Sequence, residues 1–218
     1  MAKLEDSVEF AENADPRCPC VLVLDTSGSM DGSPISLLND GLRAFAEDLR
    51  TDELARRRVE VAIVTFGGQV KVRQDFVTAD SFSPPTLVAD GATPMGAAIE
   101  SAVGLVRDRK SVYRENGVAY YRPWVFMVTD GAPTDDYHRA KALVHEEETK
   151  GGLAFFSVGV EGASMETLSD IAVRTPVRLK GLSFREMFLW LSSSQKRVSA
   201  SKPGDQTALP AADGWQAV

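Results

Sequence analysis

Residues 20–30 read CVLVLDTSGSM, an apolar run that ends abruptly in small polar residues. A short, continuous apolar run of this kind is typical of a strand that is buried on both faces. Pro34 can open a helix directly after the polar turn, and apolar residues recur at helical spacing from Leu37 to Leu49. The segment therefore predicts a buried strand, a polar turn and an amphipathic helix that ends near Arg50.

The rest of the chain continues this alternation of strands and helices. Further strands are predicted at residues 59–66, 70–76, 124–128, 153–160 and 177–179, and further helices at residues 94–106, 137–149, 165–172 and 183–191. Gly67-Gly68 turns two of these strands into a hairpin at one edge. We expect an α/β fold with a three-layer, doubly wound (Rossmann-like) and mostly parallel sheet, one antiparallel edge strand and helices on both faces.

The composition divides the chain into three parts. Residues 18–194 carry the predicted domain, residues 1–17 form an N-terminal extension, and residues 195–218 form a C-terminal tail rich in Ser, Lys, Pro, Gly and Ala. Two interpretations of the tail remain open. It is either flexible, or it is held against the domain by Leu209, Pro210 and Trp215.

Composition and charge exclude several classes of protein. The 24 Lys and Arg residues against 31 Asp and Glu residues give a net charge of −7, which disfavours nucleic-acid binding because no basic footprint is available. No apolar run approaches the roughly 18 residues of a membrane span, and residues 1–12 show no secretory signal pattern. We therefore expect a cytoplasmic protein without a membrane partner. Cys18 and Cys20 are interpreted as two thiols near a strand, with half of a zinc site as the less favoured alternative.

Polar side chains at the ends of the predicted strands carry the chemistry. Asp25 and Asp130 each end a strand, Ser27 and Ser29 follow Asp25 in the turn, and Thr93 precedes a helix. Ligands of open α/β sheets bind at the carboxyl ends of the strands, so these residues meet if their strands are neighbours. Three hydroxyls and two carboxylates are hard oxygen ligands, which suit Mg²⁺ best and also Mn²⁺ or Ca²⁺.

The motifs Asp25–Ser29, Thr93 and Asp130-Gly131 together resemble the metal-ion-dependent adhesion site (MIDAS) of von Willebrand factor A (vWA) domains. That pattern is Asp-x-Ser-x-Ser followed by a distant Thr and Asp, and all five positions match in the expected order. The resemblance covers residues 20–194. Residues 24–30, 91–96 and 129–135 are also similar to TerY-like proteins of bacterial tellurite-resistance and stress-response systems.

The resemblance implies a binding function without catalysis. It assigns Asp25, Ser27, Ser29, Thr93 and Asp130 as metal ligands, directly or through water. It also implies a protein partner that offers a Glu or Asp carboxylate, such as a kinase, a phosphatase or another stress-response protein. In some relatives the last helix, here residues 183–194, moves when metal and partner bind.

Two alternatives remain beside this interpretation. The first is a Mg²⁺-dependent phosphotransferase or phosphatase in which Asp25 is the nucleophile, although Ser27 stands where such a scheme needs a second carboxylate. The second is a scaffold that functions without metal. Asp135 and Asp136 are interpreted as caps of the helix that begins near Tyr137.

Overall fold

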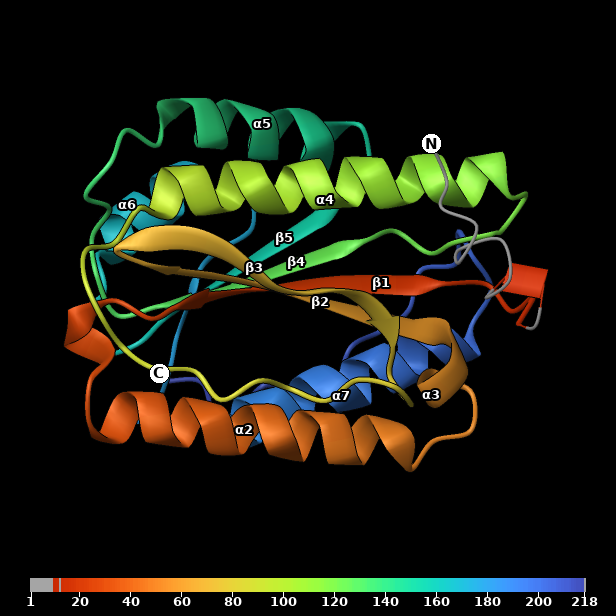
Figure 1. Ribbon diagram of the computed structural model, residues 1–218, viewed down its shortest axis with the longest axis horizontal. Coiled ribbons are helices and arrows are strands. Elements are labelled where there is room, and N and C mark those ends of the chain that lie inside the picture. Colours follow the sequence, from red (N-terminus) through yellow and green to blue (C-terminus); the bar gives the residue numbers. More distant parts are fainter. Residues whose placement is uncertain (1–9, 12, 218) are drawn as a thin grey trace.

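The computed structural model describes residues 10–11 and 13–217 and contains one sheet with strand order β3-β2-β1-β4-β5-β6 (Figure 1). All neighbouring strands are parallel except β2 and β3, which pair antiparallel. The predicted mostly parallel sheet with one antiparallel edge strand is therefore confirmed. The strands are β1 (Cys18–Asp25), β2 (Val59–Gly67), β3 (Gln69–Thr78), β4 (Trp124–Thr129), β5 (Ala154–Gly159) and β6 (Val177–Arg178).

Helices cover both faces of this sheet. Helices α2 and α7 lie on one side of the sheet, and α4, α5 and α6 lie on the other (Figure 1). The side chains of each group form one buried cluster with residues of β1. The predicted three-layer arrangement is thus confirmed. The helices are the 3₁₀ turn η1 (Gly28–Met30), α2 (Ser33–Arg50), α3 (Ala55–Arg58), α4 (Met95–Glu115), α5 (His138–Thr149), α6 (Met165–Ile171) and α7 (Phe184–Ala200).

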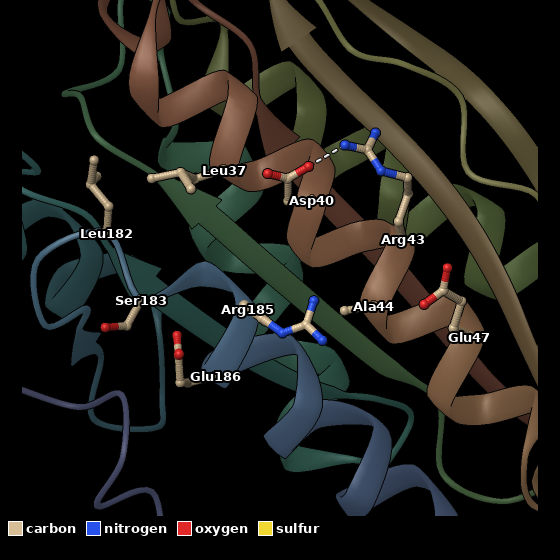
Figure 2. Close-up of a pocket in the computed structure, with 9 residues that line it drawn as sticks. All are labelled: Leu37, Asp40, Arg43, Ala44, Glu47, Leu182, Ser183, Arg185 and Glu186. Atoms are coloured by element: carbon tan, nitrogen blue, oxygen red, sulfur yellow. Dashed lines mark hydrogen bonds and ion pairs between the residues drawn. The ribbon is translucent and has the colours of Figure 1, made fainter.

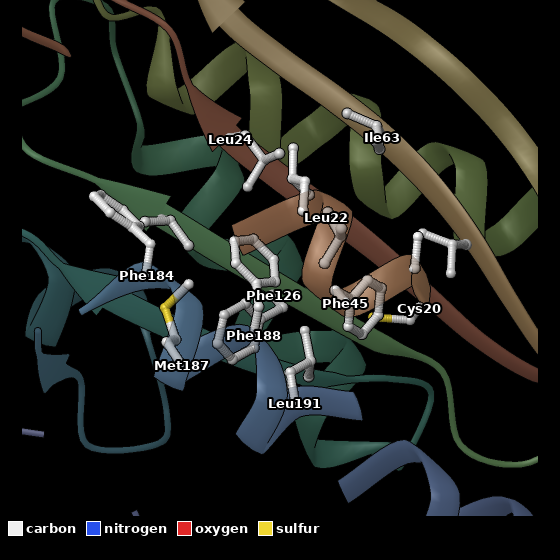
Figure 3. Packing of buried hydrophobic residues seen from close by; sticks show 14 of the residues in the cluster. Cys20, Leu22, Leu24, Phe45, Ile63, Phe126, Phe184, Met187, Phe188 and Leu191 are labelled. Atoms are coloured by element: carbon white, nitrogen blue, oxygen red, sulfur yellow. The ribbon is translucent and has the colours of Figure 1, made fainter. Parts of the chain in front are cut away.

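The alternation of side chains along β1 supplies both cores. Leu22 and Leu24 point into the α2 and α7 side, whereas Val21 and Val23 point into the α4 side. On the first side the rings of Phe45 and Phe188 lie 5.8 Å apart between their centroids, close to Leu22 (Figure 3). Because β1 is buried on both faces, its continuous apolar run needs no alternation with polar residues.

The strand order reverses direction between β1 and β4. These strands pair in parallel from Cys20 with Trp124 to Leu24 with Val128, so both end at the same edge of the sheet. The neighbourhood on which the predicted site depends is therefore present. Open α/β sheets bind ligands at such a reversal point.

Helix α7 is longer than the sequence pattern predicts. It continues to Ala200, past residue 191, where the apolar helical pattern ends, and past residue 194, where the last helix and the domain are predicted to end. The serines of this segment are compatible with a helix because their hydroxyls bond to carbonyls of the preceding turn. Ser194 Oγ donates to the carbonyl of Trp190 at 2.8 Å, and Ser192 Oγ donates to that of Leu189 at 2.9 Å.

The segment after α7 returns along the domain. Leu179 forms a β-bridge with Gln216, and the amide of Lys180 donates to the carbonyl of Trp215 at 2.8 Å. Trp190 Nε1 donates to the carbonyl of Pro210 at 2.8 Å, and Trp215 is only 3% exposed. Residues 209–217 are therefore held against the domain, in agreement with the interpretation that Leu209, Pro210 and Trp215 anchor the tail.

Other predictions concern cysteine and membrane chemistry. Cys18 and Cys20 are free and buried, in agreement with the interpretation of two thiols. Among the described residues, no helix combines the length and the apolar character of a membrane span. Most of the predicted N-terminal extension, residues 1–9 and 12, lies outside the described residues.

Candidate metal centre

Asp25 lies at the carboxyl end of β1 and is fully buried. One carboxylate oxygen accepts a hydrogen bond from the amide of Ser27 at 2.8 Å, and the other accepts one from Thr129 Oγ1 at 2.5 Å. Thr129 is the last residue of β4, so the pairing of β1 with β4 fixes the orientation of the carboxylate. Asp25 therefore presents a rigid acidic group at the sheet edge.

The two serines connect Asp25 to Asp130. Ser27 Oγ lies 3.1 Å from Ser29 Oγ, and Ser29 Oγ donates to a carboxylate oxygen of Asp130 at 2.8 Å. Ser27 and Asp130 are buried, whereas Ser29 is exposed. The cluster consequently opens to solvent at Ser29.

Thr93 reaches the cluster from the loop before α4. A Cβ atom added to Gly131 would lie 3.5 Å from Thr93 Oγ1 and 3.9 Å from a carboxylate oxygen of Asp25, which places both groups around one point. Thr93 is also tied to the loop after β4, because its amide donates to Thr134 Oγ1 at 3.1 Å. All five predicted ligands therefore meet, and they come from three loops.

The electrostatics of the cluster reflect two close carboxyl groups in a buried setting. Burial raises the pKa of the Asp25 carboxyl above its usual value, and the charge of Asp130 adds to this effect. Hydrogen bonds from Ser27 and Thr129 act in the opposite direction. Positive charge between the two carboxylates would offset both their burial and their mutual repulsion.

Backbone contacts between the loops hold the cluster in place. The amide of Gly28 donates to the carbonyl of Gly91 at 2.9 Å, and the amide of Asp90 donates to the carbonyl of Thr26 at 2.8 Å. Gly67, at the end of β2, packs so closely that an added Cβ atom would lie 2.1 Å from the carbonyl oxygen of Thr26. The loop that carries the serines is therefore confined by its two neighbouring loops.

Asp135 has a different role from the predicted one. Its carboxylate accepts hydrogen bonds from the amides of Gly96 at 3.0 Å and Ala97 at 2.8 Å, so it caps α4, not α5. Asp136 does accept a hydrogen bond from the amide of His138, the first residue of α5, as predicted. Because Asp135 fixes the start of α4, it also fixes the position of Thr93.

Sequence reasoning missed Thr129, Thr134 and Asp135 as supports of the site. For Thr129 a signal was present, since a hydroxyl at the end of a strand that neighbours β1 can reach Asp25. No local signal identifies Asp135, because its partners are almost forty residues earlier in the chain.

The chemistry of the donors fits a hard cation. Within the described part of the chain, no group of three or more His, Cys, Asp and Glu side chains is placed to hold a metal, so a site here depends on hydroxyl oxygens. Ser27, Ser29 and Thr93 supply these beside the two carboxylates, a set that suits Mg²⁺ better than softer metals.

A separate groove lies between α2 and α7 and does not include the cluster. It has a volume of about 550 Å³, and Figure 2 shows the paired side chains of Asp40 and Arg43 on one wall and Arg185 and Glu186 on the other. None of the five predicted ligands lines it.

The von Willebrand factor type A domain model matches residues 20–185, which is more than half of the chain. The chain belongs to the vWA domain family. The predicted vWA resemblance is therefore confirmed at the level of the family, and the matched range ends at residue 185, before the predicted end at residue 194.

Several solved structures share this fold at low sequence identity. The pilus adhesin SpaC from Lactobacillus rhamnosus GG superposes with a TM-score of 0.65 at 12% identity, over 84% of this chain and 30% of that chain. Proximal thread matrix protein 1 from the mussel byssus, with a zinc-occupied MIDAS motif, gives a TM-score of 0.58 at 16% identity, over 84% of this chain and 48% of that chain.

A third structure, the manganese-loaded TRAP protein of Plasmodium vivax, gives a TM-score of 0.58 at 19% identity, over 81% of this chain and 73% of that chain. Our vWA chain spans about half the length of the mussel protein structures that it matches. At these identities the likeness establishes the fold.

Proposed function

We propose that this vWA domain is a metal-dependent protein-interaction module that holds Mg²⁺ and binds a carboxylate of a partner protein. Asp25, Ser27, Ser29, Thr93 and Asp130 would hold the ion. One observation carries the proposal: five oxygen donors from three separate loops converge at the strand-order reversal, and the cluster is open at Ser29.

The balance of neutral and charged donors accounts for the binding function. Three of the five donors are hydroxyls, which neutralise less positive charge than carboxylates do. Bound Mg²⁺ would act as an electrophile with about six oxygen positions, of which the chain need not fill all. An acidic side chain of a partner would complete such a site favourably because it brings both an oxygen and a negative charge.

Two of the similar structures support the metal part of the proposal by their own contents. The mussel byssus protein carries zinc in its MIDAS motif, and the Plasmodium vivax protein is loaded with manganese. The choice of Mg²⁺ here depends on the all-oxygen donor set.

The structure disfavours the alternative in which Asp25 is a phosphate-accepting nucleophile. Asp25 is fully buried, and both of its oxygens already accept hydrogen bonds, from Ser27 and Thr129. An attack on phosphorus would require the loss of these contacts. We therefore favour binding over catalysis.

The cellular setting is a separate and finer proposal. The loop sequences at residues 24–30, 91–96 and 129–135 favour a TerY-like protein of a bacterial tellurite-resistance or stress-response system, located in the cytoplasm. The partner in that setting would be a kinase, a phosphatase or another stress-response protein.

Calorimetric titration of the metal-stripped protein tests the metal site. We expect saturable binding of Mg²⁺ and Mn²⁺ to the wild type and at least a tenfold loss in Ser27→Ala/Ser29→Ala. The exposed serines 36 and 169 provide a matched control, since Ser36→Ala/Ser169→Ala removes two hydroxyls away from the cluster. Unchanged binding in the Ser27→Ala/Ser29→Ala variant would contradict the proposed ligands.

A labelled short peptide with a single glutamate tests the carboxylate part. We expect nuclear magnetic resonance (NMR) titration to shift the amide signals of Ser27–Met30 when Mg²⁺ is present and not when EDTA is present. The same peptide with glutamine instead of glutamate is the control. Binding that persists in EDTA, or equal binding of both peptides, would support the metal-independent scaffold instead.

A further inference from the structure

A groove of about 240 Å³ lies next to the loop of the candidate metal centre, although none of the five predicted ligands lines it. One wall is the edge strand β3, and the other is the loop that leads to Thr93. Thr26, which lies between Asp25 and Ser27, lines one end of the groove together with Asp90. Thr26 and Asp90 thus place one end of the groove next to the loop that carries Ser27 and Ser29.

Two cations of β3, Lys71 and Arg73, line the groove. Both side chains are exposed, and among the residues that the structure describes neither takes part in an ion pair or a side-chain hydrogen bond. Lys71 lies opposite Thr65 of β2, which also lines the groove. A β-bulge near Arg73 shifts the register, because Val72 pairs with Val64 but Gln74 pairs with Ile63.

The charge of the groove contrasts with that of the whole chain. The chain has a net charge of −7, which repels an acidic partner in general, whereas Lys71 and Arg73 outnumber the single acidic residue of the groove, Asp90. Local positive charge next to a metal site favours one orientation of an acidic partner and increases its association rate.

On the basis of the proposed function, we infer that the partner binds through an acidic segment and not through one carboxylate alone. One carboxylate completes the metal site, and a second acidic side chain enters the groove beside Lys71 and Arg73. The two cations are thus specificity-determining residues for this partner. Exposed Val88 on the rim of the groove supplies apolar contact to the same segment.

Cations on an edge strand also discourage pairing with the edges of other sheets. The test must therefore distinguish recognition of an acidic segment from protection of the edge. Loss of solubility alone in a Lys71 or Arg73 variant would report the protective role, so the readout has to be affinity for defined peptides.

The probes are the single-glutamate peptide and a series in which a second glutamate follows at increasing spacing. In the presence of Mg²⁺, we expect at least one spacing to bind the wild type about fivefold more tightly than the single-glutamate peptide, with a gain that disappears at high salt. In Lys71→Glu/Arg73→Glu we expect this gain to vanish.

The control variant is Arg56→Glu/Arg114→Glu, which makes the same change in net charge. Both arginines are exposed and lie at the opposite end of the sheet, in α3 before β2 and in the last turn of α4 before β4. We expect this variant to keep the gain from the second glutamate.

The outcomes separate the two proposals. If the single-glutamate peptide binds only with Mg²⁺ but no second glutamate improves affinity, or if the gain survives in Lys71→Glu/Arg73→Glu, the inference about the groove is wrong and the metal site stands. If no peptide binds in a Mg²⁺-dependent manner, the proposed function itself is wrong, and the groove inference is overturned with it.

Discussion

Substitution of Gly67 tests how closely the loop that carries Ser27 and Ser29 is confined. A Cβ atom at this position would lie 2.1 Å from the carbonyl oxygen of Thr26 and 2.5 Å from its carbonyl carbon, both of which are backbone atoms. Contacts between carbon and oxygen normally begin at about 3.3 Å. In Gly67→Ala the new Cβ atom and the carbonyl of Thr26 must therefore move apart by about 1 Å. Since Thr26 lies between Asp25 and Ser27, that displacement reaches the proposed metal ligands.

The expected magnitudes follow from this overlap. Overpacking of this kind costs about 1–3 kcal/mol of folding free energy. We also expect Mg²⁺ affinity to fall at least about tenfold, because metal sites need their donors held to within about 0.5 Å. Urea denaturation measures the first effect and calorimetric titration with Mg²⁺ the second.

Gly104 is the matched control for this substitution. An added Cβ atom there meets no atom within 4 Å, and the residue lies in the interior of α4. Gly104→Ala should leave Mg²⁺ affinity unchanged and stabilise the domain by about 1 kcal/mol through helix propensity. Wild-type Mg²⁺ affinity in Gly67→Ala would refute the conclusion that the loop is confined.

Three further predictions concern the stability and chemistry of the fold. The buried carboxylate of Glu60 accepts hydrogen bonds from Arg109 at 2.8 and 2.9 Å, so Glu60→Gln should cost about 3–5 kcal/mol in urea denaturation; a loss below about 1 kcal/mol would contradict this. Trp215→Ala should destabilise the domain by about 3 kcal/mol and speed amide exchange in residues 201–217, because its ring packs 5.2 Å from that of Trp190; unchanged exchange would mean that the tail is not held there. Burial raises the pKa of the Cys20 thiol to about 12, so iodoacetamide should alkylate it slowly in the native protein and rapidly after unfolding, and rapid native alkylation would contradict its burial.

The sequence predicted the centre of the fold well because local patterns decide it. The apolar run of β1 and the hairpin at Gly67-Gly68 depend on residues that are close in the chain, and the structure has both elements. The convergence of the candidate residues at the ends of β1 and β4 could be predicted for a related reason, since strand ends in a parallel sheet meet at one edge.

Sequence patterns did not predict two kinds of hydrogen bond. One joins serine hydroxyls to carbonyls of their own helix, and the other joins residues that are distant in the chain. The helical pattern ends at residue 191 and the predicted tail begins at residue 195, but the hydroxyls of Ser192 and Ser194 bond within α7 and the helix continues. Asp135 was assigned to the following helix although it caps the earlier helix α4. The spacing of residues along the chain does not identify such hydrogen-bond partners.

Anomalous diffraction from crystals grown with Mn²⁺ tests the central claim most directly. The account predicts one strong anomalous peak among the side chains of Ser27, Ser29, Thr93 and the two aspartates, and its absence in crystals of Ser27→Ala/Ser29→Ala. A peak elsewhere in the domain, or none at saturating Mn²⁺, would contradict the assignment of this cluster as the metal centre.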